Sequence, residues 1–265
     1  MNQKPFYKNH FTALDGIRGV SLLCVILAHH VRFPLAFLAM DCFFVLSGFL
    51  ITGILLDTKV SKGYFKNFYF RRALRIFPIY YFTLFVFFYV LDGCCSLSDN
   101  PDFEFYFENE ISFWVYFQNY SLAHMDPRQS HALGHFWSLA VEEQFYLLLP
   151  LLFLFRSRWN RKALRWGFGV VIVLSLVLSI IQADKSPDTG FYLLPSRAWE
   201  LLAGAMLALF PIRNQLPKWI AELVGWSGLV GIGLACLLYT HSTPFPGAAA
   251  LSPVLGTVAI IWSTG

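Results

Sequence analysis

The sequence predicts an all-α fold, a polytopic bundle of transmembrane helices, on the strength of three observations. Hydrophobic residues make up 57% of the chain and charged residues only 14%, whereas a soluble domain usually has about 45–50% apolar and about 25% charged residues. The apolar residues form long runs, and a membrane-crossing helix needs about 20 mostly apolar residues. Most charged residues lie between these runs. Such a chain is expected to expose an apolar surface to lipid, because hydrocarbon cannot solvate charged groups.

About eight apolar runs are candidate spans, although several are short or carry a polar residue. They cover residues 14–31, 33–56, 76–91, 136–155, 166–183, 197–210, 219–239 and 247–264. We expect one transmembrane domain over residues 1–265. Because the chain stops at Gly265, at the end of an apolar run with no polar tail, we expect this domain to be incomplete at its C-terminal side.

Basic residues gather between the runs, which predicts the orientation of the chain. Positive residues accumulate on the cytoplasmic side of a membrane. With a cytoplasmic N-terminus, all but four of the 20 Lys and Arg residues lie inside, the exceptions being Arg32, Arg128, Lys185 and Arg197. The long acidic segment 92–135 then lies outside. The net charge of +4 is therefore explained by orientation, and a role in nucleic-acid binding is not expected.

Three ionisable residues share one predicted helix face in the first run. Arg18 and His29 are eleven residues apart, which is about three full turns, and Asp15 lies about 40° off the same face. An ionisable group in a bilayer costs at least about 2.5–3.5 kcal/mol, so each is a candidate functional group. Histidine suits proton transfer near neutral pH, while the neighbouring His30 points about 100° away. The alternative is a helix-start Asp, a snorkelling Arg and an interfacial His.

Two further groups lie in or beside the next runs. Asp41 is a candidate for three roles: a catalytic partner, an ion site or a buried hydrogen-bond hub. The hub is the most common of these roles for a lone Asp in a membrane helix. Ser47 and Gly48 favour close helix approach, since no G-x-S-x-G motif surrounds them. Arg72 and Arg75 are three residues apart, hence neighbours on a helix face, and guanidinium groups bind phosphate bidentately. The alternative for this pair is the ordinary excess of positive charge on the cytoplasmic side.

Carboxylates mark two later runs. Glu142 shares a predicted helix face with Ser138. Two interpretations of Glu142 are open: its carboxylate is stabilised by a helix N-terminus, or it orients an imidazole or recognises sugar hydroxyls. The sequence alone favours the helix N-terminus. Arg197 and Glu200 form an i,i+3 pair that can neutralise itself.

Sequence patterns for other chemistries are missing. There is no phosphate-binding G-x-x-x-x-G-K-[ST], no G-x-G-x-x-G and no H-E-x-x-H. The five Cys residues include no C-x-x-C pair and no zinc spacing. We therefore expect no metal.

Five phrases in order resemble the acyltransferase-3 family of bacterial membrane acyltransferases, which includes O-antigen and peptidoglycan O-acetyltransferases. The phrases are ALDGIRGVSLLCVILAHH, MDCFFVLSGFLITGILL, FRRALRIFPIYY, FWSLAVEEQFYLLLP and RAWELLAGAMLA. The resemblance runs from about residue 11 to 210. It implies a bundle of about ten helices, of which this chain would lack the last, in the bacterial cytoplasmic membrane.

The resemblance also implies site residues. The family's Arg-x10-His pattern falls on Arg18 and His29, with the histidine regarded as catalytic. Its Arg-x-x-Arg pattern falls on Arg72 and Arg75, and the arginines are regarded as helping to bind the acyl donor. We add Glu142 and Asp15 to His29 as candidate catalytic residues.

The implied function is transfer of an acyl group, acetyl in the first instance, from acyl-CoA to a hydroxyl of an envelope saccharide or lipid-linked glycan. Such a transfer needs a base for the hydroxyl or a relay nucleophile, and His29 is the candidate for either. The alternative is a transporter of a lipid-linked or anionic substrate, in which the same polar stripe lines a pathway and no acyl donor is consumed.

Overall fold

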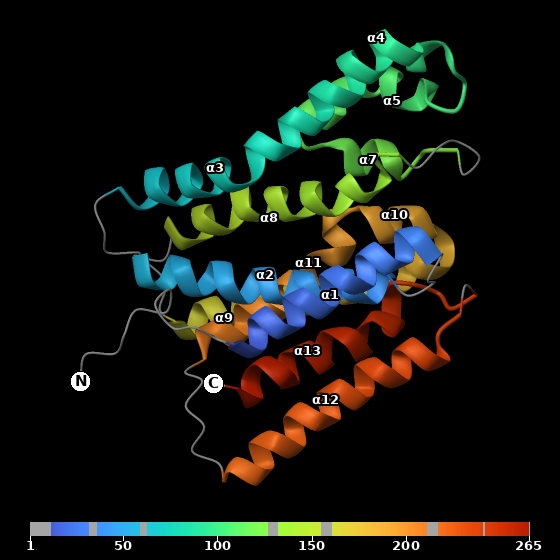
Figure 1. Ribbon diagram of the computed structural model, residues 1–265. Helices are drawn as coiled ribbons and strands as arrows, with labels where there is room; N and C mark the ends of the chain where they lie inside the picture. The colour runs from blue at the N-terminus through green and yellow to red at the C-terminus, as the bar shows by residue number, and fades with distance from the viewer. Residues whose placement is uncertain are drawn as a thin grey trace.

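Every regular element that the structure describes is a helix, which confirms the all-α prediction (Figure 1). The structure is a computed structural model, and it describes residues 12–31, 36–58, 63–126, 132–154, 161–210, 217–240 and 242–264.

Each of the eight predicted apolar runs overlaps a helix. These helices are α1 (Thr12–Val31), α2 (Ala36–Thr58), α3 (Tyr64–Phe85), α8 (Trp137–Leu154), α9 (Arg161–Lys185), α11 (Leu194–Leu209), α12 (Lys218–Leu238) and α13 (Leu251–Ser263). Shorter helices lie between them, namely α4 (Asp92–Cys95), α5 (Glu104–Glu108), α6 (Glu110–Trp114), α7 (Gln118–Leu122) and α10 (Pro187–Tyr192).

Five helices among the described residues are long and apolar enough to cross a membrane. They cover Phe37–Thr58, Tyr64–Cys95, Gly134–Phe153, Lys162–Lys185 and Lys218–Leu238. The second of these begins well before the predicted run 76–91, because the basic segment that precedes the run is itself helical. The larger count of about eight spans remains a prediction.

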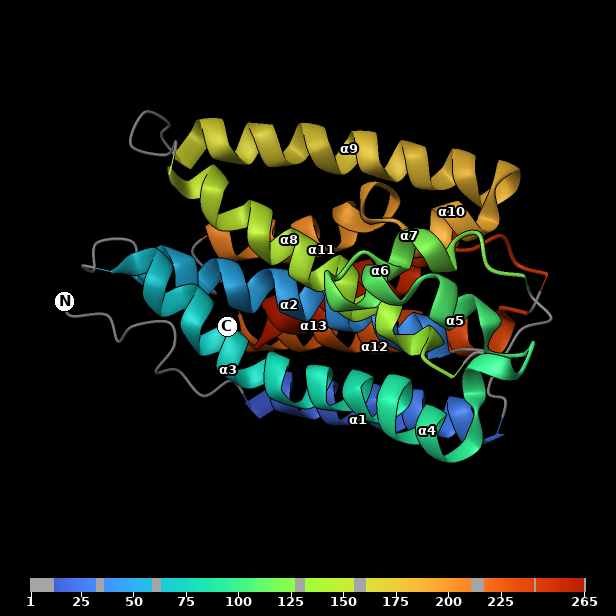
Figure 2. The same ribbon diagram turned by 90° about the horizontal axis from the view of Figure 1, so that it is seen from above.

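The helices run up and down the bundle, so that their connections gather at two ends. The short helices α4, α5, α7 and α10 lie at one end, on the right in Figures 1 and 2, which we call the loop end. Helices α3, α9 and α12 begin at the opposite end, which we call the basic end. The first turns of α9 and α12 carry Lys162, Arg165 and Lys218, and the first four turns of α3 carry Lys66, Arg71, Arg72 and Arg75.

This separation of charge makes the predicted orientation testable. Lys162 at the basic end and Ser98 at the loop end both have exposed side chains. In a background without the native cysteines, an impermeant thiol reagent applied to intact cells should label the Ser98→Cys variant. The Lys162→Cys variant should react only after the cells are permeabilised, because positive residues accumulate inside. Labelling of the Lys162→Cys variant alone would reverse the orientation.

Helix α2 is at the centre of the bundle, while three long helices are peripheral. Of its apolar stretch, 72% is buried, against 22% for those of α3 and α9 and 17% for that of α12. The exposed faces of the peripheral helices carry large apolar side chains, for example Phe82, Val173 and Leu229. An apolar outer surface of this kind suits contact with lipid.

The contact between α2 and α11 depends on two glycines. A Cβ atom at Gly48 would meet the backbone carbonyl of Leu201, and one at Gly204 would meet that of Val45. Because neither backbone carbonyl can move aside cheaply, only glycine allows the two helices to lie this close. The close approach predicted at Gly48 is therefore confirmed.

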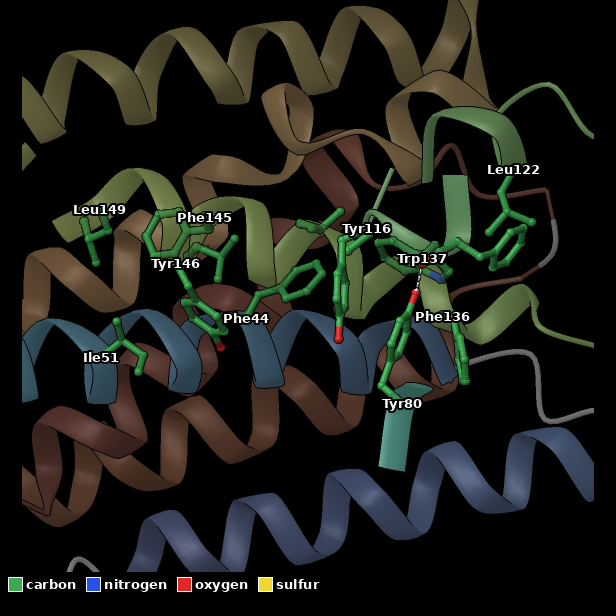
Figure 3. Packing of buried hydrophobic residues seen from close by; sticks show 14 of the residues in the cluster. Phe44, Ile51, Tyr80, Tyr116, Leu122, Phe136, Trp137, Phe145, Tyr146 and Leu149 are labelled. Atoms are coloured by element: carbon green, nitrogen blue, oxygen red, sulfur yellow. Dashed lines mark hydrogen bonds between the residues drawn. The ribbon is translucent and has the colours of Figure 1, made fainter. Parts of the chain in front are cut away.

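The acidic segment 92–126 is folded against α3 and α8 through aromatic side chains (Figure 3). The rings of Tyr80 and Tyr116 stack with centroids 4.2 Å apart. The Tyr80 hydroxyl donates to the carbonyl of Phe113 over 2.7 Å.

Helices α2 and α8 also meet through aromatic rings. Phe44 of α2 packs edge-on against Trp137 of α8, with ring centroids 5.8 Å apart. This packing places the beginning of α8 beside the middle of α2.

Candidate active site

Interior polar side chains gather in two clusters along α2. The first, which we call the Glu142 cluster, contains Ser47, Arg72, Glu142, Glu143 and Tyr146. The second, which we call the Arg197 cluster, contains Asp41, Arg197 and Glu200.

Glu142 joins α2 to α8. Its Oε1 accepts a hydrogen bond from the Ser47 hydroxyl over 2.7 Å, and its Oε2 accepts one from the Tyr146 hydroxyl over 2.8 Å. Hydrogen bonds to a charged acceptor are roughly twice as strong as neutral ones. Both carboxylate oxygens are therefore held in place by side chains of two helices.

Arg72 reaches the same cluster from α3. Its Cζ lies 3.1 Å from the centre of the Tyr146 ring, in a cation–π arrangement. Its Nε lies 3.8 Å from Oε1 of Glu143, and both side chains are only 16% exposed. The buried Nε has no hydrogen-bond partner among the described residues. The guanidinium is thus held by a ring and a long ion pair.

The depth of the Glu142 cluster follows from its positions on the helices. Ser47 is at the middle of α2, about 16 Å from either end at about 1.5 Å per residue. Arg72 is about 12 Å from the beginning of α3. The cluster therefore occupies the middle of the bundle, and Arg72 connects it to the basic end.

The helix-terminus explanation of Glu142 is wrong. Helix α8 begins at Trp137 and has no acidic residue in its first turn. Glu142 lies beyond that turn, where the influence of a helix dipole has faded. Its partners are instead Ser47 and Tyr146, and Ser138 bonds to the carbonyl of His135.

The Arg197 cluster is fully buried between α2 and α11. One terminal nitrogen of Arg197 lies 2.8 Å from Glu200 Oε1 and the other 3.2 Å from Asp41 Oδ1, and none of the three side chains is exposed. A buried ion pair needs close partners to offset its desolvation. Asp41 is therefore a buried ion-pair partner of Arg197, and the hydrogen-bond hub that the sequence favoured is wrong, since neither of its carboxylate oxygens has a hydrogen-bond partner among the described residues. The pair of Arg197 and Glu200 thus has a third member.

Aromatic rings enclose the guanidinium of Arg197. Its Cζ lies 5.4 to 5.5 Å from four ring centres, which belong to Phe44, Trp137, Phe191 and Phe245. This cage is near the loop end, since Asp41 is about 7.5 Å from the beginning of α2 and Arg197 about 4.5 Å from the beginning of α11.

The remaining predicted site residues lie on α1 and α3. Helix α1 is continuous over Thr12–Val31, so Asp15, Arg18 and His29 share one helix as expected. Asp15 is exposed and Arg18 is half-buried. The side chain of His29 lies outside the part of the chain that the structure describes. Arg75 is exposed and makes no ion pair with another described residue, whereas Arg72 is half-buried against Glu143 and Tyr146.

The two hydrogen-bond partners of Glu142 were missed in the sequence. Tyr146 follows Glu142 by four residues, a spacing that places both on one helix face, so its role was detectable. Ser47 is on a different helix, and no local pattern connects it to Glu142. Within the described residues, no group of three or more His, Cys, Asp or Glu side chains could hold a metal ion.

Comparison with known proteins gives one family and several relatives. The model of a family described as an acyltransferase domain matches residues 11–265. The chain is 28% identical over 278 residues to the peptidoglycan O-acetyltransferase OatA of Listeria monocytogenes, covering 96% of this chain and 44% of that protein. It is 32% identical over 245 residues to a Bacillus subtilis protein provisionally named a peptidoglycan O-acetyltransferase, covering 82% of this chain and 37% of that protein.

A third relative, from Staphylococcus aureus, is provisionally named an O-acetyltransferase. It is 29% identical over 252 residues, covering 87% of this chain and 40% of that protein. The chain thus spans less than half the length of each of these relatives. No solved structure matches it.

Proposed function

The chain belongs to the acyltransferase-3 family, whose model matches residues 11–265, and from this membership we propose that it transfers an acetyl group from acetyl-CoA to a hydroxyl of a cell-envelope glycan. The family match carries the proposal. The acetyl group and the glycan are suggested by the relatives, which are named as peptidoglycan O-acetyltransferases.

The separation of the two ends of the bundle supports this reaction. Coenzyme A is a cytoplasmic anion, and the basic end is the predicted cytoplasmic side. An envelope glycan is on the other side, where the loop end is expected. The acyl arm of the donor would extend from the basic end between the helices toward the loop end.

His29 is proposed as the base or acyl relay. It is two residues before the end of α1, so its backbone lies near the loop end. In the direct reaction, the acceptor hydroxyl attacks the thioester carbonyl and the C–S bond breaks as the new C–O bond forms. His29 takes the hydroxyl proton and returns it to the departing sulfur of coenzyme A.

The two proposed assisting carboxylates differ in their surroundings. Glu142 is held by Ser47 and Tyr146, which suits a group that orients a reactant in the middle of the bundle. Asp15 is exposed in the first turn of α1, beside Arg18 on the proposed donor side.

The basic residues Arg18, Arg72 and Arg75 are proposed to bind the donor, and Arg75 allows the cleanest test. A charge-assisted hydrogen bond contributes about 1.5–3 kcal/mol, and about 1.4 kcal/mol is a factor of ten. Arg75→Gln should therefore weaken acetyl-CoA binding by roughly ten-fold or more, and Arg72→Gln by at least as much. Lysine should rescue only partly, because it offers a point charge in place of a fork. Binding is measured by titration of the purified protein.

Lys66 is the matched control, because it is an exposed cation on the same helix. The Lys66→Gln variant should bind the donor nearly as well as wild type. Equal losses for Lys66→Gln and Arg75→Gln would mean that the basic end acts only as a diffuse positive field.

The competing function is transport of a lipid-linked or anionic substrate without acyl transfer. Release of free coenzyme A separates the two, since only an acyltransferase cleaves the thioester. We expect the purified protein to release coenzyme A from acetyl-CoA when envelope glycan is supplied. Movement of substrate across vesicles with no thioester cleavage would support the transporter.

A further inference from the structure

A cavity of about 460 Å³ opens at the loop end. Its walls come from the end of α9, from α10, from the beginning of α2 and from residues 240 and 242–245. Small-molecule sites typically have volumes of about 300–1,000 Å³, so the cavity has room for part of a ligand. The proposed function assigns no role to it.

One side of the cavity is aromatic. Phe37, Phe191 and Phe245 line it, with the Phe37 and Phe245 ring centres 4.3 Å apart and those of Phe191 and Phe245 6.3 Å apart. Flat aromatic rings suit the C–H face of a pyranose, which is apolar although its edge carries hydroxyl groups.

The lining also includes polar groups, and none of its described residues carries a positive charge. These polar groups are the carboxylate of Asp184 and the hydroxyls of Thr240, Ser242 and Thr243. The Thr240 and Ser242 hydroxyl oxygens are 2.8 Å apart, and Thr243 Oγ1 accepts a bond from the Thr240 N–H over 3.0 Å. A carboxylate beside hydroxyl groups accepts bonds from hydroxyls and repels anions, so the lining favours a neutral polyhydroxyl ligand.

The Arg197 cluster stands behind the aromatic wall. Phe191 and Phe245 line the cavity on one side and contact the Arg197 guanidinium on the other. That guanidinium is bound to Asp41 and Glu200, which leaves no unpaired positive charge to attract an anion through the wall. The buried cluster instead holds the two rings at fixed positions.

The cavity is at the end of the bundle where the proposed catalytic histidine lies. Phe37 follows the first residue of α2, and His29 is in the last turn of α1. A ligand in the cavity is therefore at the same end as His29 and at the opposite end from the basic residues.

We infer that this cavity is a subsite for a neutral pyranose unit of the acceptor glycan, an inference that rests on the proposed function for its role in the reaction. The aromatic side chains pack against the apolar face of the sugar. Asp184 and the three hydroxyls form hydrogen bonds with its polar edge.

Binding to purified protein in detergent tests the subsite without any need for activity. The probe is chitotetraose, a neutral tetramer of N-acetylglucosamine, titrated by saturation-transfer NMR. The Asp184→Asn variant removes the charged acceptor and should weaken binding about five-fold, because charge-assisted hydrogen bonds are roughly twice as strong as neutral ones. The Ser242→Trp variant fills the cavity and should weaken binding by at least about ten-fold. Tetragalacturonate, an acidic tetramer, should bind wild type at least about ten-fold more weakly than chitotetraose.

Two exposed positions outside the cavity supply matched controls. Asp188→Asn makes the same charge change on a neighbouring helix, and Ser98→Trp adds the same bulk elsewhere at the loop end. Both should bind chitotetraose as wild type does. The positions changed in all four variants are exposed, so loss of folding does not explain a loss of binding.

Absence of chitotetraose binding by wild type, equal binding by all variants, or a preference for tetragalacturonate would overturn the subsite. Acetyl transfer by wild type is measured separately. Intact binding that depends on Asp184, without any acetyl transfer, would overturn the proposed function and leave the saccharide site in place. Acetyl transfer by wild type, together with chitotetraose binding that is unchanged in the Asp184→Asn and Ser242→Trp variants, would overturn the subsite and leave the proposed function in place.

Discussion

Replacement of His29 by alanine is expected to lower the rate of acyl transfer by about 10²–10⁴-fold, the usual contribution of a general base. Loss of a covalent relay would remove the transfer altogether. Expression and membrane insertion should stay normal, because His29 is near the end of α1 and a single substitution leaves the apolar run intact. The measurement is acetyl transfer per mole of purified protein.

His30→Ala is the control for this variant. It removes an imidazole from the same turn of α1, but from a direction about 100° away, so most activity should remain. If the His29→Ala variant keeps more than about a tenth of the wild-type rate, His29 is not the base.

Replacement of Arg197 by leucine is expected to cost about 3–5 kcal/mol of stability, because it leaves the carboxylates of Asp41 and Glu200 buried without their cation. The midpoint of thermal unfolding in detergent should fall by several degrees. An Arg71→Leu variant removes an exposed arginine and should change the midpoint little.

A triple variant separates charge from packing in the Arg197 cluster. Asp41→Asn and Glu200→Gln, added to Arg197→Leu, remove the uncompensated charges. Because a buried ion pair can often be replaced by neutral groups at little cost, the triple variant should recover much of the lost stability. If Arg197→Leu unfolds at the wild-type temperature, the cluster does not stabilise the contact between α2 and α11.

The helices of this fold could be predicted from the sequence because their signals are local. A run of apolar residues specifies a helix in lipid whatever its neighbours are, and the basic connections at one end follow from charge alone. Gly48 marked a close approach, since a glycine in an apolar helix commonly does so. The pairing of Arg197 with Glu200 was readable from their spacing of three residues.

The interior contacts of the site could not be predicted in the same way. Asp41 meets Arg197, and Ser47 meets Glu142, only because α2 packs against α11 and α8, and no periodicity within one helix encodes these contacts. Glu142 was misread for the same reason, since its position early in a run suggested a helix terminus. The long extent of α3 was missed because its first turns are too polar to resemble a span.

The most direct test of the account is vesicle-based acetyl transfer between the two ends of the bundle. Acetyl-CoA with a radiolabelled acetyl group is enclosed in vesicles that carry the purified protein, and envelope glycan from the source cells is added outside. We expect label to appear on the outer glycan while free coenzyme A accumulates inside, and we expect both to disappear in the His29→Ala variant. Passage of the label as an intact thioester, or a wild-type protein that neither labels the glycan nor releases coenzyme A, would contradict the account.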